Sequence, residues 1–330
     1  MRCIPQQYGA EFRCTIIAIV LCAVGLSGDA QAEENRHFCV LVPHFKDDYW
    51  LSVGFGIEHE AARQKVHLSF YEAGGYRALA EQVGQLDDCA RAGVDGILIG
   101  TVTSDHPDMT TAISRASNAV PVFALVNELH ADGLAGQIGV DWRNMGYEVG
   151  AFLSRRHPKA AEAKTAVLLN GPAEAGWTAP LEDGLRQALA KSSVEIVDVL
   201  RADTGVRAQL DLVETALTRR AGVDYLIGSA PAIEAALGMT AAGNAMEQPL
   251  LVSTYVTPSI LRGLKSGRVI AAPFDDPVQQ GAMAIEHAVA AIDDGTSFDW
   301  VGPPIRLVEA GDEDLNKITF SPANFFPLIQ

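Results

Sequence analysis

The sequence predicts an α/β protein made of two similar lobes, each a parallel β-sheet flanked by helices. Short apolar segments alternate with helix-length segments along the chain. The segment ARAGVDGILIG in the first half is echoed by TRRAGVDYLIG in the second, which indicates two lobes of one architecture. Apolar runs between helices are typical of strands buried on both faces and joined by right-handed crossovers. A chain of 330 residues is long enough for two such domains.

The expected strands follow from these apolar runs. In the first half they are 38–45, 66–73, 94–100 and 120–127, and in the second half they are 164–171, 194–200, 223–230, 249–255 and 268–274. Helix-length segments such as YWLSVGFGIEHEAARQ and AQLDLVETALTRRAG lie between them.

The N-terminal segment has the features of a secretory signal peptide. Arg2 and Arg13 precede an apolar run at 15–26, and small residues follow up to Ala32, where we expect cleavage. The run is too short to span a bilayer comfortably. The residue before Cys22 is a bulky leucine, where a lipoprotein signal needs a small residue. We therefore expect an exported periplasmic protein without direct membrane insertion.

The composition is that of an acidic globular protein. Hydrophobic residues make up 48% and charged residues 20%, which argues against disorder. The formal net charge is −16, and removing 1–32 leaves it unchanged because two basic and two acidic residues are lost. This charge argues against nucleic acid or an anionic membrane as the main partner. Its simplest interpretation is solubility.

The cysteine count bears on the compartment. Cys3, Cys14 and Cys22 leave with the signal peptide, so the mature chain keeps Cys39 and Cys89. A pair of cysteines in an oxidising compartment suggests a disulfide. Both residues are expected at the same edge of the first parallel layer, which favours a disulfide over two separate buried thiols.

Two α/β lobes behind an export signal predict a venus-flytrap binding protein. We expect the backbone to cross between the lobes around 136–142, near Asp275 and near Val301. The expected lobe boundaries are therefore 33–138 with 276–298 for the first lobe, and 139–275 with 299–330 for the second. Ligands bind outside the carboxyl ends of strands in open α/β sheets, so two facing edges form a cleft that closes by hinge bending.

No catalytic set is recognisable in the sequence. There is no G-x-S-x-G, H-E-x-x-H or C-x-x-C motif. The segment GFGIEHE at 54–60 falls inside an expected helix and lacks the third glycine of a dinucleotide fingerprint. His44, His59 and His67 are not at metal-ligand spacing. The sequence thus predicts neither an enzyme nor a metal or cofactor site.

Aromatic residues mark the expected cleft. Six of them follow strand ends or crossings: Tyr49, Trp50, Tyr76, Trp142, Trp177 and Tyr255. Sugar receptors also stack aromatic rings, but they need many polar groups for the hydroxyls. Here the loops offer fewer plausible ones: Asp47, Asp48, Asn127, Asp141 and Asp275. An aromatic box with few polar groups suits a methylated ammonium, which the negative ring faces attract.

Four segments resemble the TorT family of type I periplasmic binding-protein homologues. They are DYWLSVGFG at 48–56, EAGGY at 72–76, GVDWRNMGYEVG at 139–150 and RGLKSGRVIAA at 262–272. The resemblance runs from about residue 38 to about residue 310, and its aromatic loops are the specific part. It implies a type I binding-protein fold and a periplasmic protein that senses trimethylamine N-oxide (TMAO) beside a sensor histidine kinase of the TorS type.

The resemblance also implies roles for individual residues. Five positions that match the family's pattern are expected to enclose the ligand: Tyr49, Trp50, Tyr76, Trp142 and Tyr255. Rings hold the three methyl groups, while indole N–H and phenol O–H groups supply donors to the oxygen. Trp177 either enlarges this cage or packs at its rim. Asp48 either orients a donor near the ligand or caps the helix beginning near Tyr49.

Several functions remain open on this basis. The first is a TMAO sensor that docks on the periplasmic domain of a TorS-type kinase, although betaine or choline also fits such a cage. The second is the substrate-binding component of an ABC transporter for a sugar or a methylated amine. An exported enzyme rests on the compartment alone. A repressor is disfavoured by the export signal and by the lack of a DNA-binding helix-turn-helix before Phe38.

Overall fold

The structure is a computed structural model that describes residues 36–240 and 248–330. The predicted signal peptide and its cleavage site lie outside the described residues. Within the described ranges, no helix combines the length and apolarity needed to cross a membrane.

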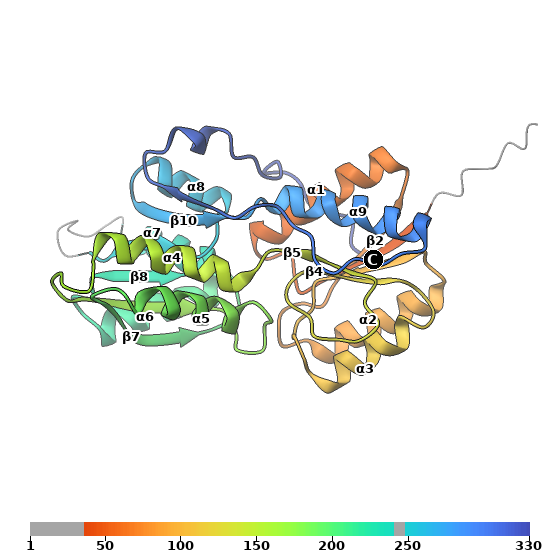
Figure 1. Cartoon of the computed structure of the whole chain (residues 1–330), viewed down its shortest axis with the longest axis horizontal. Coiled ribbons are helices and arrows are strands. Elements are labelled where there is room, and N and C mark those ends of the chain that lie inside the picture. The colour runs from red at the N-terminus through yellow and green to blue at the C-terminus, as the bar shows by residue number, and fades with distance from the viewer. Residues whose placement is uncertain (1–35, 241–247) are drawn as a thin grey trace, which may run out of the picture. The chain divides into compact units, whose positions relative to one another are not determined.

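The first lobe is built on a five-stranded parallel sheet with the order β2-β1-β3-β4-β5. Its strands are β1 (His37–Val42), β2 (His67–Glu72), β3 (Gly96–Ile99), β4 (Val122–Val126) and β5 (Gly136–Gly139). Its helices are α1 (Asp48–Gln64), α2 (Leu79–Ala92), α3 (Pro107–Ala116) and α9 (Pro277–Asp294). Helices α1 and α9 lie on one face of the sheet, and α2 and α3 lie on the other (Figure 1).

The second lobe has a six-stranded sheet with the order β11-β10-β9-β8-β6-β7, parallel except for β11. Its strands are β6 (Lys164–Asn170), β7 (Val194–Arg201), β8 (Tyr225–Gly228), β9 (Leu250–Ser253), β10 (Val269–Phe274) and β11 (Arg306–Glu309). Its helices are α4 (Trp142–Arg156), α5 (Thr178–Leu189), α6 (Val206–Arg219), α7 (Ala230–Thr240) and α8 (Pro258–Lys265), followed by the 3-10 turn η2 (Glu313–Asn316). The predicted two-lobed α/β fold is confirmed.

The chain passes between the two sheets at three places. It leaves β5 for α4, returns from β10 to α9, and leaves α9 again for β11. The first and third passages lie side by side, because Ile138 forms a parallel bridge with Val301. The backbone N–H of Gly139 donates to the carbonyl of Val301 at 2.9 Å. Such paired segments are the places where hinge motion between lobes is absorbed.

The C-terminal segment differs from the expectation that 299–330 belongs wholly to the second lobe. After β11 and η2, the chain returns to the first lobe (Figure 1). Ile329 forms a parallel bridge with Phe70 of β2, and the N–H of Gln330 donates to the Phe70 carbonyl at 2.9 Å. Phe325 packs edge-on against Phe55 of α1. The tail thus covers an edge strand that would otherwise expose unpaired backbone groups.

The glycine-rich segment at 54–60 serves helix packing. Gly56 of α1 lies so close to α9 that a Cβ atom there would be 2.0 Å from the Val278 carbonyl oxygen. Gly281 of α9 makes the reciprocal approach to Val53. These two glycines let the helix backbones meet closely, so the segment is structural, as its position inside a helix predicted.

Cys39 of β1 and Cys89 of α2 form a disulfide that closes a separation of 50 residues. Both cysteines are buried among the apolar residues beneath the first sheet. The bond links α2 to β1 within the first lobe.

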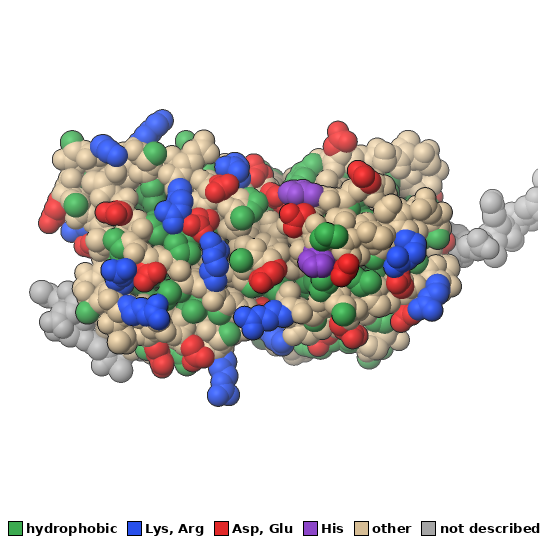
Figure 2. Space-filling model, turned by 90° about the horizontal axis from the view of Figure 1, so that it is seen from below, with side chains coloured by type: hydrophobic (Ala, Val, Ile, Leu, Met, Phe, Trp, Pro, Cys, Tyr) green, Lys and Arg blue, Asp and Glu red, His purple; other side chains and the backbone are tan. Residues whose placement is uncertain are grey.

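The surface carries both signs of charge. Figure 2 shows Lys and Arg side chains interspersed with Asp and Glu side chains on the face it presents. This face therefore has no broad basic surface of the kind that binds nucleic acid.

Replacing both Cys39 and Cys89 by serine is expected to destabilise the mature protein by about 4 kcal/mol, because the unfolded chain regains the entropy of a 50-residue loop. Urea unfolding of the variant and of the oxidised wild type measures the difference. Wild type treated with reductant is the matched control and should resemble the variant. An unchanged unfolding midpoint in both would contradict this role.

Candidate ligand-binding site

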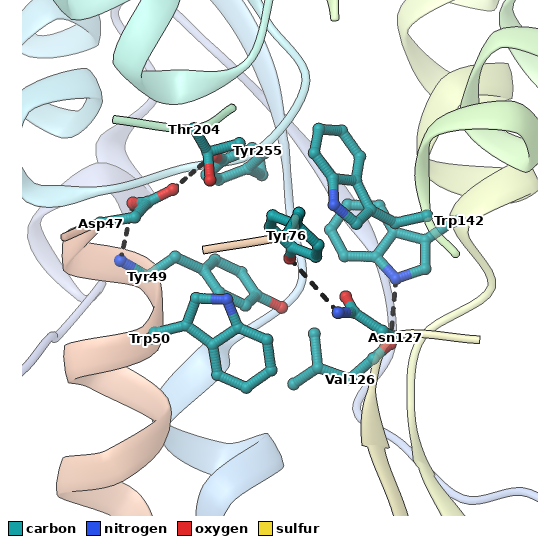
Figure 3. Close-up of a pocket in the computed structure, with 10 residues that line it drawn as sticks. Asp47, Tyr49, Trp50, Tyr76, Val126, Asn127, Trp142, Thr204 and Tyr255 are labelled. Carbon is teal, nitrogen blue, oxygen red and sulfur yellow. Dashed lines mark hydrogen bonds between the residues drawn. The ribbon is translucent and has the colours of Figure 1, made fainter. Parts of the chain in front are cut away.

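A small cavity of about 20 Å³ lies between the two lobes. Its lining residues are Asp47, Tyr49, Trp50, Tyr76, Val126, Asn127, Trp142, Trp177, Thr204 and Tyr255. This volume is far below the roughly 300–1,000 Å³ typical of pockets for drug-sized ligands. The closed lobes therefore leave little empty space between the rings, and the site suits only a very small guest. Figure 3 shows the lining side chains.

The lining side chains come from the carboxyl-end loops of both sheets. In the first lobe, Tyr49 and Trp50 stand in the first turn of α1, and Tyr76 follows β2. In the second, Trp177 immediately precedes α5 and Tyr255 follows β9. Parallel strands bring these loops to one edge of each sheet, and the two edges face each other across the cavity.

The rings form a continuous cage. The ring centroids of Tyr49 and Tyr255 are 5.3 Å apart with the planes at 76°, and Trp142 lies 6.3 Å from the first and 6.4 Å from the second. Trp177 extends this wall, 5.5 Å from Trp142. The contacts of Tyr255 with Tyr49 and Trp142 are edge-to-face, an arrangement that is favourable between aromatic side chains. Each of the six predicted aromatic residues is at most 4% exposed.

Two glycines make room for the indole rings. A Cβ atom at Gly100, just after β3, would be 2.2 Å from the Trp50 ring. A Cβ atom at Gly171, just after β6, would be 2.2 Å from the Trp177 ring. The two strands thus end in glycine at the points where a large side chain crosses the sheet edge.

Trp142 is anchored by a strained backbone. Val126 has φ +65°, in a region that β-branched residues rarely adopt. Its carbonyl accepts a hydrogen bond from the indole N–H of Trp142 at 3.0 Å (Figure 3). Gly139 permits this arrangement, since a Cβ there would be 2.9 Å from the Val126 carbonyl oxygen. The Trp142 N–H is therefore committed to the protein.

Asp47 is a buried carboxylate at the cage wall. As the N-cap of α1, it accepts a hydrogen bond from the backbone N–H of Tyr49 at 3.0 Å. Its second oxygen accepts from the Tyr255 hydroxyl at 2.5 Å, which joins the two lobes. Burial raises the pKa of Asp47 to about 7, against the opposing effect of these two donors.

Asp275 forms a second pair of this kind behind the cage. It ends the passage from β10 toward α9 and is fully buried. Its Oδ2 accepts hydrogen bonds from the Tyr49 hydroxyl at 2.6 Å and from Nε2 of Gln280 at 3.0 Å. Burial raises the pKa of Asp275 to about 6. Burial and the neighbouring carboxylates raise the pKa values of Tyr49 and Tyr255 well above their usual value.

Hydrogen-bond donors gather at Tyr76. Nδ2 of Asn127 donates to the Tyr76 hydroxyl at 3.2 Å and to the carbonyl of Thr101 at 2.8 Å (Figure 3). Burial raises the pKa of Tyr76 to about 12, and hydrogen bonds from Asn127, Trp50 and Trp177 oppose this rise. Asn127 thus uses its amide protons within the protein. The donors that remain at this end of the cavity are the Tyr76 hydroxyl proton and the indole N–H groups of Trp50 and Trp177 near it.

The lobes are closed over the cavity. Nε2 of His44 in the first lobe lies 2.8 Å from the Thr204 hydroxyl in the second. Burial lowers the pKa of His44 to about 4, so this imidazole is neutral at physiological pH. Together with the Asp47–Tyr255 bond, this contact holds the two edges together.

The structure brings all six predicted aromatic residues to one cavity, including Trp177, which lines it. Asp48 differs from its expected place, because it is exposed in the first turn of α1 and does not line the cavity. The neighbouring Asp47 is both the helix cap and the wall residue. Asp141 caps α4 instead of reaching the cavity. The Val126 carbonyl accepts the Trp142 N–H, so this indole lines the cavity with its ring.

No group of three or more His, Cys, Asp and Glu side chains suited to a metal ion occurs in the ranges 36–240 and 248–330. The Asn127 amide and the Tyr–Asp pairs are the polar groups that the sequence did not single out as a network. In the sequence, this network was indicated only by the presence of these acids and this amide in the loops at strand ends.

The fold and this interlobe cavity define the class of the protein, a two-lobed periplasmic binding protein. Residues 38–297 match the family described as periplasmic binding protein domain. The chain is 36% identical to the periplasmic protein TorT of Escherichia coli K12 over 309 residues, which covers 92% of this chain and 87% of TorT. The chain belongs to the TorT family of periplasmic binding proteins, and this places it in the periplasm.

Solved structures support the same relationship. A TorS sensor domain–TorT complex without ligand matches with a TM-score of 0.78 and 34% identity over 90% of this chain and 100% of that chain. The complex in the presence of TMAO matches with a TM-score of 0.78 and 33% identity over the same shares. An ABC transporter solute-binding protein from Bradyrhizobium sp. BTAi1 with bound Bis-Tris matches with a TM-score of 0.75 and 32% identity over 90% of each chain.

Asp47→Asn is expected to change how stability depends on pH. The folded-state pKa of about 7 exceeds the ordinary value of 3.8, so the folded protein holds a proton that the unfolded chain has released between these values. Wild-type stability therefore falls relative to the variant as pH rises from 4 to 7, by at most about 1.4 kcal/mol per pH unit. Asparagine remains a good helix cap.

Urea unfolding of both ligand-free proteins from pH 4 to pH 9 measures this difference. The difference in the free energy of unfolding between wild type and variant should change up to about pH 7 and stay constant above it. A gap that is independent of pH would show that Asp47 is ionised without penalty in the folded protein.

Proposed function

We propose that this protein binds TMAO in the aromatic cage and signals its presence to the periplasmic domain of a TorS-type sensor histidine kinase, inducing TMAO respiration. The observation that carries the proposal is the cage itself, six buried rings with hydrogen-bond donors at one end and a carboxylate at the wall. The relatives that share the fold at 33–34% identity form a complex with the TorS sensor domain, in one case in the presence of TMAO.

The chemistry of TMAO matches the two ends of the cavity. Its three methyl groups surround a positive nitrogen, which the faces of Tyr49, Trp142 and Tyr255 can attract. The negative charge of Asp47 adds to this attraction. The oxygen of TMAO only accepts hydrogen bonds, and the Tyr76 hydroxyl proton and the neighbouring indole N–H groups of Trp50 and Trp177 can supply them. TMAO would therefore lie with its oxygen toward Tyr76 and its methyl groups toward the opposite rings.

Signalling would depend on closure of the lobes. The cage is assembled from both sheet edges, so the ligand contacts all rings only in the closed form. A ligand that binds the closed form more tightly shifts the population toward it. A kinase domain docked on a surface that differs between open and closed forms would respond to this shift, and the coupling would be reciprocal.

A binding role without catalysis also fits the site. The buried acids Asp47 and Asp275 each accept a hydrogen bond from a tyrosine hydroxyl. A general base must instead reach a proton on the substrate. His44, the histidine nearest this site by its contact with Thr204, is buried with a lowered pKa. These groups are therefore engaged in holding the cage.

Transport is the alternative function. The solute-binding protein from Bradyrhizobium, with bound Bis-Tris, is 32% identical to this chain and serves an ABC transporter by its description. Bis-Tris contains a tertiary amine with hydroxyl groups, so this relative holds an amine of another kind. Carbohydrate-binding relatives at 15–19% identity share the fold alone.

Calorimetry with a ligand panel tests the proposed function. TMAO is expected to bind with the highest affinity, betaine and choline more weakly because their longer substituents exceed the cavity, and ribose not at all. Titration of the ligand-free and TMAO-bound protein with a TorS periplasmic domain then tests signalling. Ribose binding without any response to methylated amines would overturn the proposal, and TMAO binding without any kinase contact would favour transport.

Single substitutions test the cage. Trp50→Ala and Trp142→Ala are each expected to weaken TMAO binding at least about tenfold, since one ring contact with a cation contributes on the order of 1 kcal/mol or more when buried and each large ring also shapes the cavity. Tyr147→Ala is the matched control, because Tyr147 lies on α4 like Trp142 but is 39% exposed. Normal binding by both tryptophan variants, measured by calorimetry, would exclude this cavity as the site.

A further inference from the structure

Tyr49 and Tyr255, whose rings contact each other in the cage, each donate a hydrogen bond to a buried acid. The Tyr49 hydroxyl donates to Asp275 at 2.6 Å, and the Tyr255 hydroxyl donates to Asp47 at 2.5 Å. The two rings are nearly perpendicular with centroids 5.3 Å apart, and both line the cavity. Asp275 does not line it, so this acid acts on the cavity only from behind a ring.

Neither acid has a basic partner among the described residues. No ion pair in the ranges 36–240 and 248–330 includes Asp47 or Asp275. The groups that favour the ionised form of Asp275 are the Tyr49 hydroxyl, the Gln280 amide and its own backbone. These donors are neutral, so the negative charge is stabilised but not cancelled.

A phenol that donates a short hydrogen bond to a carboxylate gains phenolate character. Charge-assisted hydrogen bonds are about twice as strong as neutral ones, and bonds in a low-dielectric interior polarise one another. Electron density pushed into the ring makes its face more negative, and the attraction of a cation to a ring grows with that negative potential. The effect does not depend on any new contact with the ligand.

We propose that Asp275 and Asp47 are positioning residues that set the specificity of the cage: by accepting the hydroxyl protons of Tyr49 and Tyr255 in hydrogen bonds, they enrich both ring faces and so select a positively charged N-methylated group over a neutral group of the same shape. This inference rests on the proposed function. Shape alone admits any compact trimethyl group, whereas polarised rings discriminate by charge.

Asp275 gives the cleaner test, because Asp47 also faces the ligand directly. Asp275→Asn keeps an oxygen that can accept the Tyr49 hydroxyl but removes the charge. Tyr49→Phe keeps the ring and the acid but removes the bond between them. Asp276→Asn is the matched control, because Asp276 is the adjacent acid and caps α9, where its side chain accepts from the backbone N–H of Gln279. Asparagine also tolerates the left-handed backbone of that residue, φ +47°.

The experiment compares the affinities of TMAO and of tert-butanol at pH 8 by tryptophan fluorescence. Tert-butanol has the same shape as TMAO but a neutral carbon in place of the positive nitrogen. Asp275→Asn and Tyr49→Phe are each expected to weaken TMAO binding about tenfold and to change tert-butanol binding less than about twofold. Asp276→Asn should leave both affinities unchanged. An unaltered affinity ratio in Asp275→Asn overturns the inference. A ratio lost in Asp275→Asn but kept in Tyr49→Phe also overturns it, because the charge then acts without the ring.

A second measurement needs no ligand, so it tests the polarisation of the Tyr49 ring separately from the proposed binding of TMAO. Labelling of tyrosine Cζ with ¹³C, with Tyr49 assigned from Tyr49→Phe, reports the electron density of the phenol ring in the free protein. The Tyr49 resonance is expected to move upfield in Asp275→Asn, away from the phenolate position, and to stay in place in Asp276→Asn. Equal spectra overturn the inference even where TMAO binds. Failure of the wild type to bind any methylated amine, with the shift present, is a failure of the proposed function.

Discussion

The site depends on two buried carboxylates surrounded by neutral donors. Removing a carboxylate from water is costly unless another charge compensates it, and hydroxyls and amides compensate it only in part. Asp47 and Asp275 therefore leave a negative potential in the cavity, and the ring faces between them have the same sign. A guest with a positive nitrogen supplies the missing counter-charge. This is consistent with a small cavity that is lined by six aromatic rings, one acid and one amide, with no arginine.

These acids also lie where the two lobes communicate. Asp47 caps the first helix of one lobe and accepts a hydrogen bond from Tyr255 of the other. Asp275 stands at the passage from β10 to α9, and its bond to Tyr49 connects that passage to the cage. Compensation of the charge by a ligand and closure of the lobes thus involve the same bonds. A change of ligand occupancy is expected to reach the hinge segment at Asp275 through Tyr49.

Much of this arrangement could be predicted from the sequence, and the rest depends on features that leave no pattern in it. Long apolar runs placed nine strands correctly, and strand ends located the six rings. Two strands were missed: β5, four residues at a passage between the lobes, and β11, which is short, antiparallel and at an edge. Asp47 and Asp48 are adjacent, and a one-residue difference in the start of α1 decides which one faces inward. The anchoring of Trp142 depends on a positive φ at Val126, a conformation that valine rarely adopts.

A crystal structure of the mature protein with TMAO tests the central claim most directly. The account predicts the TMAO nitrogen within about 6 Å of the ring centroids of Tyr49, Trp142 and Tyr255. It also predicts the oxygen within hydrogen-bond distance of donors at the Tyr76 end. TMAO bound outside the cavity, or bound inside with its oxygen toward Asp47 and its methyl groups toward Asn127, would contradict it.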